Sequence, residues 1–247
     1  MLGGMDPVAF RVLGRPIYWY GIMVAAGFLA GIAHWTRAAR RRGWPPEYGS
    51  DIGLWIMVGG LIGARVAYVL ANWPSYAAAP WTVFRFDQGG LVYYGGFIGA
   101  ALAVAAFARR RRRPLLQMGD YAIGAVPLGH AIGRIGCFIN QCCYGAETAA
   151  RLHVTVDGVP RHPVQLYEAV ANALIFVLMI QFLPRRRRDG ESLALYLLLY
   201  GTARFLLEFL RGDARLRWLG LTLAQVVSLA LFAVGAALWV LLPRREP

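Results

Sequence analysis

Residues 219–242 read LGLTLAQVVSLALFAVGAALWVLL and contain no charged side chain. A helix of about 20 mostly apolar residues is long enough to cross the hydrocarbon core of a bilayer. Six further stretches are similar in length and mostly apolar. Helices are expected rather than strands, because lipid leaves backbone groups no other hydrogen-bond partners. The sequence therefore predicts seven spans, at residues 17–36, 52–72, 90–107, 121–139, 164–183, 192–210 and 219–242.

The composition points to the same class of protein. The chain of 247 residues is 58% hydrophobic and 16% charged, whereas soluble domains have about 25% charged residues. The formal net charge is +13 and every basic side chain is arginine, in short runs between the apolar stretches. This pattern favours an anionic lipid surface over nucleic acid as partner. We expect an all-α polytopic membrane helical bundle that forms one integral membrane domain over residues 1–247.

Arginine is unevenly distributed between the loops. Four alternate loops hold fifteen arginines and the remaining four regions hold eight. By the positive-inside rule the first set is cytoplasmic, so the N-terminus lies outside and the C-terminus lies in the cytoplasm. The connection over about residues 140–163 then forms a small extracytoplasmic element, with a β-hairpin around Asp157 and Gly158. The cytoplasmic set is Arg37, Arg40–Arg42, Arg109–Arg113, Arg185–Arg188, Arg244 and Arg245.

Three arginines fall inside the spans, at a cost of several kcal/mol each unless they face a cavity or a partner. At 1.5 Å per residue, Arg65, Arg134 and Arg204 lie about 8 to 10 Å below the outer ends of their spans. Other polar residues lie within about two turns of the outer ends, so polar groups from most helices converge in the outer half of the membrane. These other residues are Tyr20, Tyr94, Glu168 and Gln225.

These residues also have purely structural interpretations. Arg204 and Glu208 are four residues apart on one helical face and can neutralise one another. Arg65 and Arg134 have no acid three or four residues away and can extend to the interface, while Tyr20 and Tyr94 suit interface aromatics. Unpaired arginines near headgroup depth nevertheless favour an anionic ligand, because the guanidinium group matches phosphate in a bidentate way.

Small residues and cysteines also form local patterns. Glycines four residues apart allow helix backbones to approach closely in lipid, so we expect packing at the pairs 59/63, 95/99 and 129/133. The three cysteines lie within seven positions and form neither a disulfide framework nor a zinc pattern. We expect packing roles for them, with a disulfide involving Cys137 left as an alternative. The cysteines are Cys137, Cys142 and Cys143.

The segment Gly133–Gly145, read GRIGCFINQCCYG, resembles the signature of the prolipoprotein diacylglyceryl transferases, Gly-Arg-x-Gly-Asn-Phe-x-Asn-Gly-x-x-x-Gly. Further stretches resemble that family in the same order, over roughly residues 17 to 230. They are Trp19-Tyr20-Gly21, Gly63-Ala64-Arg65-Val66-Ala67-Tyr68, Tyr94-Gly95-Gly96, Arg161-His162-Pro163-Val164-Gln165-Leu166-Tyr167-Glu168, Tyr200–Phe205 with Glu208 and Arg211, and Gln225 with Ser228.

The resemblance implies a bacterial cytoplasmic (inner) membrane enzyme that crosses the membrane many times. It would transfer the diacylglyceryl group of phosphatidylglycerol to the lipobox cysteine thiol of prolipoproteins, giving a thioether and glycerol phosphate, the first step of lipoprotein maturation. Its partners would be phosphatidylglycerol, prolipoprotein signal peptides and membrane lipid, with no nucleic acid, cofactor or metal. The implied catalytic residues are Arg134, Arg204, Tyr200 and Tyr94, and the implied substrate contacts are Arg134, Arg65, Tyr20, Asn140, Glu208, Gln165 and Glu168.

The chain departs from the family pattern at several places. The family's histidine is Tyr94 here, and a tyrosine with a pKa near 10 is a poor base at neutral pH. Cys137 stands where the signature has asparagine, and Gln141 stands where it has glycine. Cys142 stands where the family often has an acidic residue.

Two alternatives to the transferase stay open: a transporter or flippase for an anionic lipid, and a non-catalytic lipid-binding paralogue.

Overall fold

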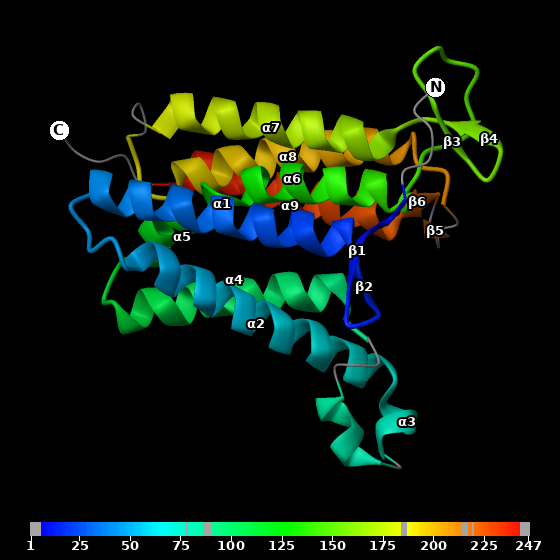
Figure 1. The fold of residues 1–247 in the computed structure, drawn as a ribbon. Helices are drawn as coiled ribbons and strands as arrows, with labels where there is room; N and C mark the ends of the chain where they lie inside the picture. Colours follow the sequence, from blue (N-terminus) through cyan, green and yellow to red (C-terminus); the bar gives the residue numbers. More distant parts are fainter. Residues whose placement is uncertain are drawn as a thin grey trace. The chain divides into compact units, whose positions relative to one another are not determined.

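The computed structural model describes residues 6–77, 79–85, 90–183, 187–213, 217–218 and 220–242. Among the predicted cytoplasmic arginines, Arg185, Arg186, Arg244 and Arg245 lie outside these residues. The described chain is mostly helical, with three short antiparallel β-hairpins (Figure 1). By chain contacts it divides into two compact units, which are described separately. Unit 1 comprises residues up to His34 and from Ile123 onward, and unit 2 comprises Trp35–Ala122.

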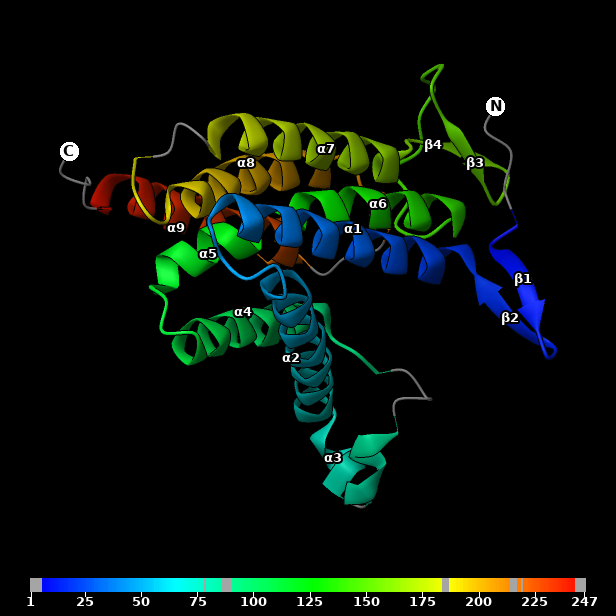
Figure 2. The ribbon, with the colours of Figure 1, turned by 60° about the vertical axis from the view of Figure 1, so that its left-hand side comes forward.

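In unit 1 the long helices lie side by side and run along one direction (Figures 1 and 2). Helix α6 packs on α7, α7 on α8, and α8 on α9. The helices are α1 (Trp19–Arg41, to His34 in this unit), α6 (Val126–Ile139), α7 (Val164–Phe182), α8 (Glu191–Glu208) and α9 (Leu223–Leu241). The hairpins are β1–β2 (Val8–Val12, Arg15–Tyr18), β3–β4 (Val154–Val156, Val159–Arg161) and β5–β6 (Arg217–Trp218, Leu221–Thr222).

All three hairpins lie at one end of unit 1 (Figure 1). They precede α1, join α6 to α7 and join α8 to α9, so this end of unit 1 collects three of the four regions that the sequence predicts to lie outside. The β3–β4 turn consists of Asp157 and Gly158, both with positive φ (51° and 78°), a combination typical of a type I′ turn. The hairpin predicted around these residues is confirmed.

Unit 2 is built on the packing of α2 (Tyr48–Ala71) against α4 (Tyr93–Arg110). A Cβ atom on Gly63 would lie 2.3 Å from the Gly95 carbonyl oxygen, and one on Gly99 would lie 2.2 Å from the Gly59 oxygen. The packing role predicted for these four glycines is therefore confirmed. The unit also contains α3 (Trp73–Ala77), the 3-10 helix η1 (Pro80–Phe84) and α5 (Leu115–Ile123).

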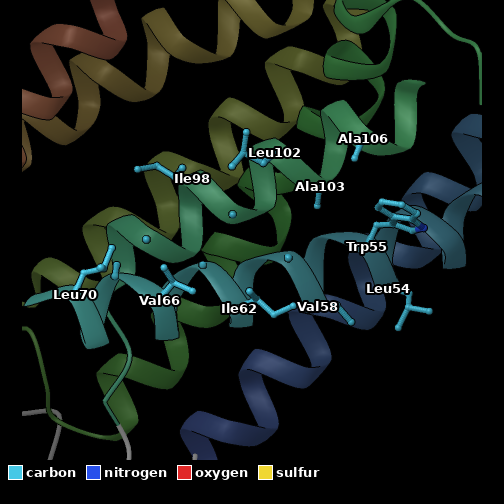
Figure 3. Close-up of a pocket in the computed structure, with 15 residues that line it drawn as sticks. Leu54, Trp55, Val58, Ile62, Val66, Leu70, Ile98, Leu102, Ala103 and Ala106 are labelled. Carbon is cyan, nitrogen blue, oxygen red and sulfur yellow. The ribbon is translucent and has the colours of Figure 1, made fainter. Parts of the chain in front are cut away.

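An apolar groove runs along the α2–α4 pair (Figure 3). It encloses about 780 Å³, and its lining consists of apolar side chains and glycines, with Leu54 to Leu70 on α2 facing Gly95 to Ala106 on α4. Such a surface suits hydrocarbon and offers nothing to a charged group.

Five helices are long and apolar enough to cross a membrane: α1, α2, the stretch Leu115–Ile139, α7 and α9. This fits a polytopic membrane protein. Helices α4 and α8 are not among the five, and α8 carries three charges, Glu191, Arg204 and Glu208. The expectation of seven spans and of their orientation therefore stays a prediction, as does the single domain.

Several predicted span boundaries differ from the helix ends. The first span was expected from Ile17, but Ile17 and Tyr18 belong to β2 and the helix begins at Trp19. The seventh was expected from Leu219, but Leu221 and Thr222 belong to β6 and α9 begins at Leu223. The fourth span was expected from Tyr121, but the candidate span begins at Leu115 and is broken by a turn at Gly124 and Ala125, between α5 and α6. Pro127 explains the break, because proline has no N–H for a preceding turn and is tolerated in the first turn of a new helix.

Candidate functional site

Four charged side chains from three helices meet inside unit 1. They are Arg134 on α6, Glu168 on α7, and Arg204 and Glu208 on α8. Glu168 is shared: Oε2 pairs with Nε of Arg134, and Oε1 lies 3.5 Å from Nη1 of Arg204. Arg204 Nη1 also lies 2.7 Å from Glu208 Oε2. Both carboxylates are buried, which opposite charges in contact make tolerable.

The pairing of Arg204 with Glu208 confirms the prediction from their spacing. The expectation that Arg134 lacks an acidic partner is wrong, because that expectation considered only residues three or four positions away. Its partner Glu168 lies on the next helix. The structure thus brings together Arg134, Arg204, Glu168 and Glu208 from the predicted set.

Arg211 joins this cluster, although the prediction did not include it among the site residues. Its Nη1 atom lies 3.7 Å from Glu168 Oε1, and Asp213 accepts two hydrogen bonds from its guanidinium at 2.8 and 2.7 Å. Backbone pairing positions it, because Gly145 bridges to Arg211 and the Gly212 N–H donates to the Tyr144 carbonyl. Its place three residues after Glu208, directly after the predicted sixth span, was the available signal.

Thr222 connects the cluster to α9. Its hydroxyl donates a 2.8 Å hydrogen bond to Glu208 Oε1 and accepts one from the Gln225 N–H, while the Gln225 side chain accepts from the Thr222 N–H. This is a capping box at the start of α9. The pattern Thr-x-x-Gln before an apolar run was the sequence signal for it.

Several buried atoms of the cluster lie close enough to an opposite charge to form an ion pair, but they are not oriented for a hydrogen bond. Within the described residues, Glu168 Oε1 and Oε2, Arg134 Nε and Arg204 Nη1 make no hydrogen bond. Buried polar atoms are normally satisfied, so the cluster retains capacity for a polar ligand.

Three expected substrate contacts also belong to unit 1. Gln165 is buried, and its Nε2 donates a 2.7 Å hydrogen bond to the Cys142 carbonyl. Asn140 is the C-cap residue of α6. Tyr20 lies on α1 beside Gly136 of α6, where an added Cβ would be 3.2 Å from the Tyr20 Cα. Gly136 therefore permits the close approach of the two helices.

The cysteines lie beside the arginines. Cys137 Sγ is 3.8 Å from Nη1 of Arg134, and Cys142 Sγ lies 3.7 Å from the Cys137 carbonyl oxygen. All three cysteines are free thiols, so the disulfide considered for Cys137 is not formed in this structure. Hydrogen bonds from Cys137 and Cys142, together with Arg211, lower the pKa of the Cys143 thiol despite its partial burial.

Tyr200 lies on α8, one turn before Arg204. Its ring stacks on Tyr196 with centroids 5.4 Å apart and lies 5.6 Å from the ring of His130 on α6. Sequence reasoning missed His130, although it precedes Arg134 by four residues and so shares its helical face.

Arg65 and Tyr94 belong to unit 2. Arg65 is 4% exposed, and its guanidinium donates hydrogen bonds of 2.8 to 3.2 Å to the carbonyl oxygens of Thr82, Val83, Arg85 and Gly90. These bonds hold the segment that connects α3 to α4. Tyr94 lies in the first turn of α4, partly buried, with its ring edge-on to Tyr93 at 5.7 Å.

Known proteins resemble this chain over almost its whole length. The profile of the prolipoprotein diacylglyceryl transferase family matches residues 7–241. Proteins named phosphatidylglycerol–prolipoprotein diacylglyceryl transferase include one from Clostridioides difficile, 38% identical over 91% of this chain and 90% of its own. Others are from Nitratidesulfovibrio vulgaris, 37% identical over 98% and 94%, and Finegoldia magna, 35% identical over 95% and 94%.

The chain belongs to the prolipoprotein diacylglyceryl transferase family. The arginines and acids of the buried cluster lie in the segments that carry the resemblance to prolipoprotein diacylglyceryl transferases. Of the departures from the family signature, Cys137 lies on α6 beside Arg134, and Cys142 lies in the turn that follows the helix. Within the described residues, no group of three or more His, Cys, Asp or Glu side chains could hold a metal ion.

Proposed function

We propose that this chain transfers the diacylglyceryl group of phosphatidylglycerol to the thiol of a lipobox cysteine in prolipoproteins, with release of glycerol phosphate. The relatives carry the name of this activity. The observation that carries the proposal is the buried cluster in which Glu168 is shared by Arg134, Arg204 and Arg211. No other charged cluster of this kind occurs within the spans of the described residues.

The proposed reaction requires positive charge beside the departing phosphate. The acceptor thiolate attacks the glyceryl carbon next to the phosphate, a carbon–oxygen bond breaks, and negative charge grows on the departing phosphate. Guanidinium groups about 3 Å from those oxygens stabilise that charge strongly where water is excluded. Arginine suits this role because its planar fork matches two phosphate oxygens.

The pattern of ion pairs supports Arg134 as the phosphate ligand. Arg204 has a second acid in Glu208, and Arg211 has one in Asp213, whereas the only acid paired with Arg134 among the described residues is Glu168. If Arg134 turns to a phosphate, Glu168 is still balanced by the other two arginines. The exchange therefore leaves no buried carboxylate without a positive neighbour.

Glu168, Gln165 and Asn140 complete the proposed site beside the phosphate. A carboxylate can accept a hydrogen bond from a glycerol hydroxyl or from the acceptor thiol. Gln165 Oε1 is buried and makes no hydrogen bond within the described residues, so it offers a second acceptor. Tyr20 is 44% exposed at the rim and suits contact with the lipid headgroup or the signal peptide.

We further infer seven spans, with the three hairpins outside and the C-terminus in the cytoplasm of a bacterium. Helices α4 and α8 are the two additional spans, each of 18 residues. The charges of α8 are those of the cluster, and Glu191 pairs with Arg188 at its other end. This supports a span whose charges are neutralised within the protein rather than a helix outside the membrane.

The test is transfer of labelled phosphatidylglycerol to a lipobox peptide by the purified chain in liposomes. We expect a thioether-linked diacylglyceryl peptide and an equal amount of glycerol phosphate. Growth of a bacterium depleted of its own diacylglyceryl transferase should be restored in parallel. Binding of phosphatidylglycerol without product would favour the non-catalytic paralogue, and movement of lipid between leaflets without product would favour the flippase.

A further inference from the structure

A second polar layer lies one helical turn from the arginine cluster. His130 precedes Arg134 by four residues on α6, and Tyr200 precedes Arg204 by four on α8. Four residues advance about 6 Å along a helix axis. The two rings face one another across the helices, with centroids 5.6 Å apart and planes inclined by 48°.

His130 has hydrogen-bonding capacity that the protein does not use. Its ring contacts Tyr200, and within the described residues neither ring nitrogen makes a hydrogen bond. The side chain is only partly buried by the protein. A polar ring within a span is expensive to leave without a partner and marks a functional position.

The electrostatic surroundings of His130 define what it can bind. Arg134 follows His130 by one turn on α6, and Arg204 follows Tyr200 by one turn on α8, so the positive charge that an anion needs is already supplied by the adjacent layer. A neutral imidazole offers one N–H donor and one acceptor nitrogen. His130 therefore suits a neutral acceptor, in contrast to the arginine layer, which suits an anion.

The proposed donor lipid presents these two chemistries in the same order. Its phosphate is followed by the glycerol carbons and then by ester carbonyl groups, which accept hydrogen bonds. Five bonds separate the phosphorus from the nearest ester carbonyl carbon, and at roughly 1.2 Å of advance per bond they reach about 6 Å. This distance matches the separation between the arginine layer and the His130 layer.

We propose that His130 donates a hydrogen bond to an ester carbonyl of the diacylglyceryl group, and so makes the site selective for ester-linked over ether-linked phosphatidylglycerol. This proposal rests on the transferase function proposed above. In the bound lipid, Arg134 holds the phosphate and His130 holds the ester, so the reacting glyceryl carbon is fixed between two points. Tyr200 supports the ring of His130 from α8.

The experiment compares two donor lipids with identical tails, dipalmitoyl phosphatidylglycerol and its dihexadecyl ether analogue, which lacks the carbonyls. We measure kcat/KM for transfer to a lipobox peptide by the full chain in liposomes. One hydrogen bond corresponds to a preference of about fivefold to tenfold for the ester lipid. His130→Leu should lower the ester value by about that factor and leave the ether value unchanged.

Two further variants sharpen the test. His130→Gln keeps an N–H donor and should retain most of the preference for the ester lipid. Ile135→Leu, at an exposed position on the same helix, should leave both values unchanged. Equal transfer from both lipids by the wild-type chain would overturn the proposal, and this measurement does not depend on whether any variant folds.

The remaining outcomes are equally decisive. A His130→Leu chain that keeps the wild-type ester preference overturns the proposal, as does one that loses transfer from both lipids, since the carbonyl contact predicts an unaffected ether reaction. If the wild-type chain transfers from neither lipid, the proposed function itself fails. Failure of the ester contact and failure of the enzyme activity are therefore distinguishable.

Discussion

Arg134 is the residue whose replacement tests the phosphate contact most directly, because among the described residues it has one acidic partner while Arg204 and Arg211 have two each. Arg134→Ala and Arg134→Lys should both lower transfer by ~10²–10³, since lysine keeps the charge but loses the planar fork. The measurement is labelled-lipid transfer by protein shown to be folded by size-exclusion chromatography. Arg151→Lys, at an exposed position, is the matched control.

Arg204→Ala should lower transfer to a similar degree and also reduce thermal stability. Removing this guanidinium takes away a close partner of the buried Glu208 carboxylate, and breaking a buried pair costs about 3–5 kcal/mol. The hydrogen bond from Thr222 to Glu208 offsets part of that loss. Near-wild-type transfer by both alanine variants would return the two arginines to a purely structural role.

Tyr94 is expected to contact ligand rather than to act as the base. A phenol with an ordinary pKa near 10 is poorly matched to proton abstraction at neutral pH. Tyr94→Phe should keep transfer within about tenfold of the wild-type rate, the loss expected for one hydrogen bond, and Tyr94→His should be active. An inactive but folded Tyr94→Phe protein would show that the hydroxyl takes part in the chemistry.

At the scale of elements, the α2–α4 contact depends on glycine. Gly63→Ala should destabilise the protein by about 1–3 kcal/mol, because its Cβ would come 2.3 Å from the Gly95 oxygen and 2.8 Å from the Gly99 Cα. Gly60→Ala on the same helix is the matched control, since its nearest neighbour would be 3.5 Å away. Thermal denaturation in detergent measures both, and equal melting temperatures would contradict the packing account.

The start of α9 positions the cluster through Thr222. Thr222→Val keeps the shape of the side chain but removes both the cap and the hydrogen bond to Glu208. We expect a loss of about 1 kcal/mol in stability and a fall in transfer, with both restored by Thr222→Ser. If serine restored stability but not transfer, Thr222 would not act through its hydroxyl in positioning Glu208.

At the scale of the whole molecule, the distribution of arginines predicts which loops face the cytoplasm. In a chain whose three native cysteines are serine, a cysteine at Arg110 should resist a membrane-impermeant maleimide in intact cells. A cysteine at Asp157, in the β3–β4 turn, should react readily once the outer membrane is permeabilised. Both positions should react after lysis, and the reverse pattern in intact cells would invert the topology.

Local patterns in the sequence determined much of this protein. Apolar length predicted the helices, the Asp157–Gly158 pair predicted a hairpin, the glycine spacings in α2 and α4 predicted a close helix pair, and the four-residue spacing of Arg204 and Glu208 predicted their contact. Each of these depends on neighbours within a turn or on the requirements of lipid. These features could be predicted from the sequence because the interactions that determine them are local.

Only the tertiary structure decided the partners of the remaining charges. Glu168 on α7 meets Arg134 on α6, Arg211 joins them through backbone pairing near Gly145, and Arg65 binds carbonyl oxygens of η1. Hydropathy cannot predict such contacts. Lipid excludes a charged side chain from the lipid-facing surface of a helix, but this does not specify which buried group pairs with that side chain. That choice depends on how the helices pack, and packing is set by contacts between residues far apart in the chain.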